Sequence, residues 1–271
     1  MSSGYWNHKI CLITGASTGL GLAIAQALAE RGARVALNAR REQPLQEAVE
    51  LIRRGGGEAT AWVGDVTRQE DVDRLAQEID ARLGPLDLLC NCAGRSARSP
   101  ILETAPDDFQ RLLDVNLLAA VRTTRAFAET LIAQRGHLVN IGSLASKVAP
   151  RFMGAYPASK FALAAYCQQL RLELGPRGLH VLLACPGPIA REENAPRYTE
   201  QTANVPAEAR RPGAGAKLRG IEPDWLAKKI LTACEQRRSE LVVPAKARLL
   251  FALAQLSPRW GDWLLGRSTS A

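Results

Sequence analysis

Short apolar segments alternate with longer segments of helical periodicity along most of this 271-residue chain. Apolar segments of four to eight residues predict buried strands, and the segments between them are long enough for helices. Strands that alternate with helices in this way predict a parallel sheet with right-handed crossovers and helices on both faces. We therefore expect one doubly wound α/β domain over residues 1–271. The strands expected in its seven-stranded parallel sheet are residues 9–14, 34–38, 59–63, 86–90, 137–141, 178–184 and 241–243.

A glycine-rich turn directly follows the first expected strand and leads into a helix. Its sequence from Thr14 to Gly21 is T-G-A-S-T-G-L-G. Glycines at such a turn let the backbone approach a pyrophosphate, and the N-terminus of the following helix favours the negative charge. The order of strand, glycine turn and helix therefore predicts a dinucleotide site. The residues expected to contact the cofactor here are Gly15, Ser17, Thr18, Gly19, Leu20 and Gly21.

The second expected strand is followed by two arginines, Arg40 and Arg41. A site for NAD usually has an acidic residue at this point, which binds the ribose hydroxyls. Guanidinium groups instead suit the 2′-phosphate of NADP(H). The alternative is an ordinary solvent-exposed start of a helix, but basic residues there are unfavourable next to the helix dipole. The sequence therefore predicts NADP(H) as the cofactor.

The next two strands end in residues that suit a ligand at the carboxyl edge of the sheet. Asp65 and Val66 follow the third strand, and Asp65 is a candidate acceptor for the adenine amine. Its alternative role is an Asx turn that starts the next helix. Asn91, Ala93 and Gly94 follow the fourth strand, where small residues leave room for a ligand against the backbone. We expect all five residues to contact the cofactor.

Ser143, Tyr156 and Lys160 form the candidate catalytic group. Tyr156 and Lys160 are four residues apart, which places them on one face of a helix. A phenol has an ordinary pKa of about 10, and a nearby ammonium group lowers it towards neutral pH. Ser143 follows an apolar strand and can donate a hydrogen bond to a substrate oxygen. Asn116 lies in an apolar helical segment, residues 106–134, where its amide needs a polar partner.

Together these motifs resemble those of the short-chain dehydrogenase/reductase family over nearly the whole chain. The family's cofactor turn matches Thr14, Gly15, Gly19 and Gly21, and its N-N-A-G motif matches residues 91–94 with Cys92 in place of one Asn. The resemblance implies a Rossmann-type fold and a catalytic tetrad of Asn116, Ser143, Tyr156 and Lys160. It also implies cofactor contacts from Tyr156, Lys160, Pro186, Gly187 and Ile189. Many relatives have a threonine at the position of Arg191, so the anchoring of the nicotinamide amide departs from the usual pattern here.

The resemblance implies hydride transfer between a nicotinamide and a carbonyl or secondary alcohol. In this mechanism Tyr156 exchanges the proton, Lys160 lowers its pKa and binds the nicotinamide ribose, and Asn116 holds a water that relays protons. The expected substrate is apolar and resembles a lipid, a steroid or a long-chain ketone. The alternatives are a 3-oxoacyl-thioester reductase, an epimerase or dehydratase of the family, and a non-catalytic NADP(H)-sensing protein. Candidate substrate contacts are Arg95, Ser96, Leu144, Phe152 and Met153.

Composition excludes several other classes of protein. The net charge is +8, and the residues from Pro188 onward carry 14 Lys and Arg against 9 Asp and Glu. No nucleic-acid motif accompanies this charge, so an anionic cofactor, an anionic substrate or a membrane surface explains it better.

The six cysteines and three histidines are scattered in the sequence, so we expect free thiols, isolated histidines and no metal site. No lysine follows the glycines, which excludes a P-loop NTPase, and a cytoplasmic location is expected.

Two segments lie outside the regular pattern. Residues 189–221 form a long irregular segment, which predicts a substrate loop or lid. Residues 244–267 predict two short C-terminal helices whose apolar residues cover too wide an arc to be solvated on all sides. This extension is expected to cover the substrate mouth and to contribute to a homodimer or homotetramer. Peripheral contact with a membrane is the less favoured alternative.

Overall fold

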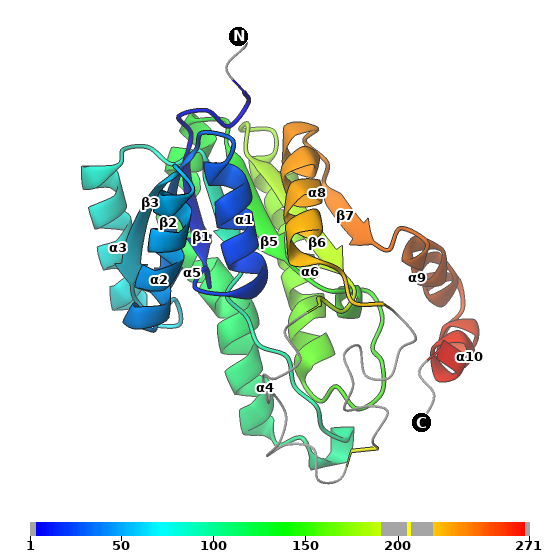
Figure 1. Cartoon of the computed structure of the whole chain (residues 1–271). Helices are drawn as coiled ribbons and strands as arrows, with labels where there is room; N and C mark the ends of the chain where they lie inside the picture. The colour runs from blue at the N-terminus through cyan, green and yellow to red at the C-terminus, as the bar shows by residue number, and fades with distance from the viewer. Residues whose placement is uncertain (1–3, 191–204, 207–218, 269–271) are drawn as a thin grey trace.

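The computed structural model describes residues 4–190, 205–206 and 219–268 of the chain. Within them, seven parallel strands form one sheet in the order β3-β2-β1-β4-β5-β6-β7 (Figure 1). This confirms the expected doubly wound Rossmann-type sheet. The strands are β1 (Ile10–Thr14), β2 (Arg34–Ala39), β3 (Glu58–Val63), β4 (Leu88–Asn91), β5 (His137–Ile141), β6 (His180–Pro186) and β7 (Glu240–Val243). Their ends differ from the expected ones by at most two residues.

Helices cover both faces of the sheet, as Figure 1 shows. Helices α1 (Gly19–Ala29), α2 (Glu42–Arg54) and α8 (Pro223–Glu235) contribute to one apolar cluster, and α3 (Gln69–Arg82), α5 (Ala119–Ala133) and α6 (Tyr156–Leu174) contribute to a second. In β1, Cys11 and Ile13 belong to the first cluster and Leu12 to the second. This alternation of side chains buries the strand on both faces, as parallel sheets require.

The helical segment expected over residues 106–134 is not uniform. It consists of α4 (Pro106–Leu113), the π-helical turn η2 (Asp114–Leu118) and α5. A π-helical turn inserts an extra residue into a helix and is frequent at functional sites. Here the turn carries Asn116, whose buried amide is bonded to the Arg95 backbone and to the Ser159 side chain. Helical periodicity alone does not show such an insertion.

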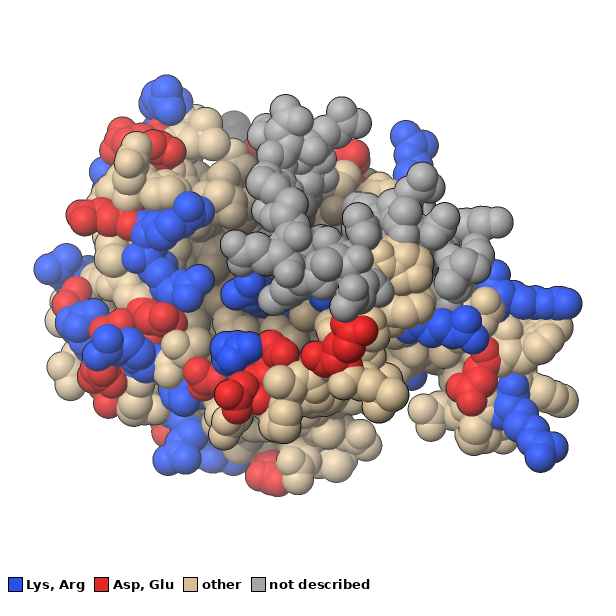
Figure 2. Space-filling model, turned by 90° about the horizontal axis from the view of Figure 1, so that it is seen from below, with Lys and Arg blue, Asp and Glu red and all other residues tan. Residues whose placement is uncertain are grey.

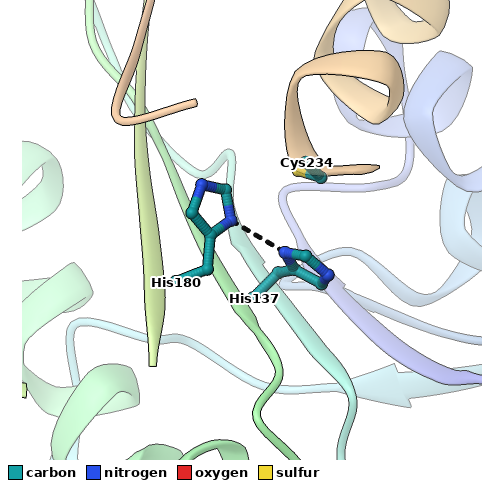
Figure 3. Close-up of side chains that lie close together, drawn as sticks. All are labelled: His137, His180 and Cys234. Atoms are coloured by element: carbon teal, nitrogen blue, oxygen red, sulfur yellow. Dashed lines mark hydrogen bonds between the residues drawn. The ribbon is translucent and has the colours of Figure 1, made fainter. Parts of the chain in front are cut away.

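The expectation of isolated histidines is wrong for His137 and His180. These residues begin β5 and β6 and are directly paired in the sheet, so their Nδ1 atoms lie 2.7 Å apart (Figure 3). His180 Nε2 lies 2.8 Å from the Arg238 carbonyl oxygen, and Tyr5 Oη lies 2.7 Å from His137 Nε2. The carbonyl can only accept, so in neutral rings His180 donates to it, His137 donates to His180, and the Tyr5 hydroxyl donates to His137.

Cys234 lies beside these two rings, and the three possible ligand atoms are within 4.8 Å of one another. In the hydrogen-bonded chain just described, however, both nitrogens of each imidazole already have a partner. We therefore assign the cluster a structural role at the amino-terminal edge of the sheet. It attaches the N-terminal segment to the start of β5, because the Tyr5 and Trp6 rings also contact the His137 ring in tilted arrangements, with centroids 5.8 and 5.5 Å from it.

The C-terminal segment forms two short helices, α9 (Ala247–Leu256) and α10 (Pro258–Ser268). They lie beyond β7, at the edge of the sheet (Figure 1). Short 3₁₀ turns η1 (Ile101–Glu103) and η3 (Leu144–Ser146) complete the elements used below. In the described part of the chain, no helix combines the length and the apolar character needed to cross a membrane.

Candidate active site

The predicted site residues follow the carboxyl ends of neighbouring strands. Thr14 at the end of β1 is paired with Asn38 of β2 and with Asn91 of β4, and Asn91 is paired with Asn140 of β5. These pairings place the segments that follow the strands along one edge of the sheet, where open α/β sheets bind their ligands. Figure 2 views the molecule from the side of this edge.

The backbone of the glycine turn after β1 lies directly against the backbone of the turn after β4. Gly15 has a φ of +65°, and a Cβ at this position would lie 2.8 Å from the Ala93 Cα. The Thr14 hydroxyl oxygen accepts hydrogen bonds from the backbone N–H groups of Cys92 and Ala93, each at 3.2 Å. Glycine at position 15 is therefore required by both backbone conformation and space.

The N-terminus of α1 is open at the same edge. Gly19 has a φ of +58°, and a Cβ there would meet nothing within 4 Å. The N-cap residue Thr18 makes no side-chain capping bond, and the first turn of α1 has no acidic residue. The first N–H groups of a helix need partners, and together with the helix dipole they favour an anion. The turn therefore has the features of a pyrophosphate site; Ser17 and Thr18 border it, whereas Leu20 and Gly21 are buried.

Arg40 and Arg41 are exposed directly after β2. The Arg40 guanidinium lies 3.7 Å from an Asp65 carboxylate oxygen. The other Asp65 oxygen accepts hydrogen bonds from the backbone N–H and the hydroxyl of Thr67, so the expected Asx turn is present. Asp65 thus forms the Asx turn at the carboxyl edge of the sheet, and its contact with the adenine amine stays a prediction. Val66 is buried beside it.

Asn91 uses its side chain inside the protein. Its Nδ2 donates to Asn140 Oδ1 at 2.9 Å, and its Oδ1 accepts from the Thr123 hydroxyl at 2.8 Å. All three residues are buried. The side chain of Asn91 therefore links β4 to β5 and α5 at the floor of the site, and only its backbone remains for the predicted cofactor contact.

Lys160, Asn116 and Gly94 come together at the centre of the site. Lys160 is buried, and its Nζ donates to the Ile141 carbonyl at the end of β5, at 2.8 Å. A Cβ on Gly94 would lie 2.9 Å from Asn116 Oδ1 and 3.6 Å from Lys160 Nζ. Burial lowers the pKa of the Lys160 ammonium to about 8. Lys160 therefore stays mostly protonated at neutral pH. A side chain at position 94 would crowd Asn116 Oδ1 and lie in contact with the Lys160 ammonium.

Tyr156 begins α6, and Lys160 lies one turn further along it. Lys160 Nζ is 5.9 Å from the centre of the Tyr156 ring. Ser143 lies two residues after Ile141, whose carbonyl binds Lys160, and η3 with Ser143 as its N-cap packs on α6. The Ser143 hydroxyl accepts from the Ala145 N–H at 3.1 Å. The structure thus places Ser143, Tyr156 and Lys160 around the junction of β5 and α6.

Sequence reasoning missed Ser159. Its hydroxyl donates to the Tyr156 carbonyl at 2.7 Å and accepts from Asn116 Nδ2 at 2.9 Å. Asn116 Oδ1 also accepts from the Arg95 N–H at 2.8 Å, and Asn116 Nδ2 donates to the Arg95 carbonyl at 2.8 Å. Ser159 therefore joins the helix of Tyr156 and Lys160 to the turn of Asn116. A small polar residue between Tyr156 and Lys160 is the only sequence signal for this role.

The remaining predicted contacts follow β6 or lie on neighbouring loops. The N–H of Gly187 donates to the Val243 carbonyl at 2.7 Å, and a Cβ there would lie 3.5 Å from Leu144. Ile189 forms a bridge with Ile221, and Met153 forms one with Ser99. Pro186 ends β6, and Phe152 precedes Met153 in the same loop as Arg151. Arg191 and most of the expected lid, residues 191–204 and 207–218, lie outside the described residues.

Comparison with known proteins agrees with the architecture and with these motifs. A family model described as short chain dehydrogenase matches residues 9–202. Ketoacyl reductase HetN from Nostoc sp. is 31% identical over 258 residues, which cover 92% of this chain and 85% of that protein. Some other curated relatives are longer: the chain spans 15% of glycine betaine reductase ATRR from Emericella nidulans and 44% of the probable oxidoreductase EphD from Mycobacterium bovis.

Solved structures are similar over almost the whole chain. A short-chain dehydrogenase/reductase from Burkholderia phymatum in complex with NAD is 25% identical, with a TM-score of 0.82 over 100% of this chain and 99% of that one. A metagenomic short-chain oxidoreductase in complex with NADP is 32% identical, with a TM-score of 0.71 over 88% of this chain and 98% of that one. The match of the family model and the 31% identity to the Nostoc protein show that the sequence, as well as the fold, is similar to this family. The chain belongs to the short-chain dehydrogenase/reductase family of oxidoreductases.

Proposed function

We propose that the protein is an NADP(H)-dependent oxidoreductase that interconverts a carbonyl group and a secondary alcohol on an apolar substrate. The observation that carries this proposal is the placement of Lys160, buried and bonded to the end of β5, one helical turn from Tyr156. A buried ammonium next to a phenol favours the phenolate, and so adapts the phenol to exchange protons near neutral pH.

The residues at the carboxyl edge fit a dinucleotide. The open N-terminus of α1 at Gly19 suits the pyrophosphate, and the exposed guanidinium groups of Arg40 and Arg41 suit a 2′-phosphate. Gly94 leaves space beside Lys160 that a Cβ would reduce. Pro186, Gly187 and Ile189 would border the nicotinamide end. When bound, the nicotinamide would supply or accept the hydride.

The chain's own side chains would orient the substrate and move the proton. Ser143 would donate a hydrogen bond to the reacting oxygen. The Tyr156 hydroxyl would give that oxygen a proton during reduction, and the Tyr156 phenolate would accept one from it during oxidation. The positive charge of the Lys160 ammonium would stabilise the phenolate. Asn116 would position a water near Lys160, and Ser159 would fix the orientation of Asn116 relative to α6.

The residues expected to contact the substrate are mixed in character, and the relatives add a second candidate class. Leu144, Phe152 and Met153 offer apolar contacts, whereas Arg95 and Ser96 offer polar ones. The name of the Nostoc relative, ketoacyl reductase, favours 3-oxoacyl thioesters as a second candidate class. The test is a panel of ketones, secondary alcohols and 3-oxoacyl thioesters, followed by NADPH absorbance with the purified protein. No turnover in either direction, combined with tight NADPH binding, would support a cofactor-sensing role instead.

An Arg40→Ala variant is expected to bind NADPH about 10- to 100-fold more weakly and NADH with nearly unchanged affinity. Removal of a charge-assisted hydrogen bond costs about 1.5–3 kcal/mol, and only NADPH carries the phosphate that would use it. Dissociation constants from fluorescence titration provide the measurement. Arg54→Ala, at the opposite end of α2, is the matched control and should change neither affinity. Equal losses for both cofactors would contradict the assignment of Arg40 to the 2′-phosphate.

A further inference from the structure

Helices α9 and α10 form a pair with a defined inner side. Ala247, Phe251 and Ala254 of α9 and Leu265 of α10 pack on the apolar cluster that α6 also joins. A Cβ on Gly261 would lie 2.8 Å from the Cβ of Ala254, so the two helices touch each other closely. Positions 247, 251 and 254 are spaced by four and three residues, which is one face of a helix.

The outer side of the same pair is apolar and exposed. Leu249, Leu256, Trp260 and Trp263 are 68%, 79%, 61% and 56% exposed. Leu249 and Leu256 are seven residues apart and share one side of α9, away from Phe251. Trp260 and Trp263 are three residues apart on α10. Four large apolar side chains on two adjoining helices form an exposed patch of the kind that marks an interaction surface.

Basic residues surround this patch. Lys246, Arg259 and Arg267 are all exposed, and the Arg267 guanidinium lies 4.3 Å from the centre of the Trp263 ring. Arg248 is exposed as well, but its guanidinium donates to the Glu240 carbonyl of β7 at 3.3 Å and so faces the sheet. Asp262 is the one acidic residue among the described positions 245–268. Lys and Arg side chains accordingly mark the part of the molecule that projects to the right in Figure 2. With Lys246, Arg259 and Arg267 against Asp262, the patch carries a local excess of two positive charges.

We propose that the outer side of α9 and α10 docks the protein on the surface of a bilayer that contains anionic lipids. Tryptophan prefers the interfacial region of a bilayer, and arginine and lysine can bury their stems while their charges reach lipid phosphates. Helices of 10 and 11 residues are about 15 Å long, roughly half the hydrocarbon thickness. They lie on such a surface and do not span it. This inference concerns a surface outside the proposed catalytic centre and does not depend on its activity.

A second copy of the chain fits this patch less well. A two-fold interface would place the same patch on both sides and bring two sets of three basic residues together, with one Asp262 on each side to offset them. The substrate of the same molecule fits less well too, because the exposed side chains point away from the cluster on which the helices pack. Anionic head groups supply the complementary charge.

The test is co-sedimentation of the full-length protein with vesicles of phosphatidylcholine alone and of phosphatidylcholine with phosphatidylglycerol. We expect binding to the anionic vesicles that weakens with added salt. Trp260→Ser combined with Trp263→Ser should reduce the partition coefficient at least about tenfold. Arg259→Gln combined with Arg267→Gln should reduce it about 25-fold on anionic vesicles, at about fivefold per basic residue.

Two matched controls separate the patch from the general properties of the surface. Trp225→Ser removes an exposed tryptophan of α8 that also has a cation nearby, Lys229, and should leave vesicle binding unchanged. Lys228→Gln combined with Arg54→Gln removes two exposed charges elsewhere and should have little effect. Circular dichroism and NADPH titration check that each variant is folded. Absence of vesicle binding, or equal losses in patch and control variants, would overturn the proposal. A tryptophan variant that still binds vesicles but forms a smaller assembly on a sizing column would overturn it in favour of a subunit interface.

Discussion

A Tyr156→Phe variant is expected to lose about 10³-fold or more in kcat/KM while its affinity for NADPH stays within a few-fold of the parent. The substitution removes one hydroxyl group and keeps the ring that lies 5.9 Å from Lys160. General acid–base catalysis contributes typically 10²–10⁴-fold, and a group that acts mainly in the transition state contributes little to ground-state binding. Steady-state kinetics with any substrate from the carbonyl panel, together with a cofactor titration, provides the measurement.

Two further variants define the specificity of this effect. Tyr166→Phe removes a phenol ten residues further along α6, in a half-buried position, and should leave kcat/KM nearly unchanged. Lys160→Ala should reduce both turnover and cofactor affinity, because the ammonium is expected to act on the phenol and on the nicotinamide ribose. Retention of most activity by Tyr156→Phe would exclude the phenol as the proton-transfer group.

The order and direction of the strands could be predicted because they depend on local signals. Each strand is an apolar segment, each helix has its own periodicity, and the right-handed crossover rule then leaves few arrangements. Most of the differences between expectation and structure are at the ends of elements, where hydrogen bonding and the following turn decide the boundary. Leu86, for example, is buried but precedes the first paired residue of β4, Leu88.

The sequence predicts which residues form the candidate site, but it does not predict most of the hydrogen bonds that these residues make. The backbone turns at Gly15 and Gly19 follow from the glycines themselves. The sequence did not show that Asn116 lies in a π-helical turn, nor that Ser159 connects it to α6, because both depend on how two helices pack. Asn91 was expected at the cofactor, yet its side chain bonds to Asn140 and Thr123 in the protein interior.

The contact between His137 and His180 shows the same limit. The two residues are 43 positions apart, and only the pairing of β5 with β6 in a particular register brings them together. Neither strand alone predicts that register, because β5 and β6 lack the regular alternation of apolar and polar residues that fixes the register of a half-buried strand. The Tyr5 hydroxyl and the Arg238 carbonyl complete the chain of hydrogen bonds from segments at opposite ends of the sequence.

This cluster gives the second large prediction: lowering the pH from 7 to 5 should reduce the free energy of unfolding by about 2 kcal/mol through His137 alone. The pKa of His137 in the folded protein is lowered to about 3. Burial is the largest cause, and the neighbouring His180, Arg237 and Lys9 add to it. In the unfolded chain its pKa is about 6.5. Between these values only the unfolded chain binds the proton, so stability is complete above about pH 6.5 and decreases as the pH falls. The lowered pKa of His180, which is also caused mainly by burial, acts in the same direction.

Urea unfolding at pH 7 and pH 5 measures this decrease. A His137→Gln variant should be less stable than the parent at pH 7, because it interrupts the series of hydrogen bonds from Tyr5 to the Arg238 carbonyl. It should lose less stability than the parent on acidification, because glutamine does not titrate. Leu172→Gln is the matched control: it also introduces a glutamine, but at an exposed position of α6 that does not titrate, and it should leave the pH dependence as in the parent. If His137→Gln and the parent lost equal stability between pH 7 and pH 5, His137 would not be held neutral by the fold. The pH range matters, because most carboxylates remain ionised above pH 5 and contribute little to the difference.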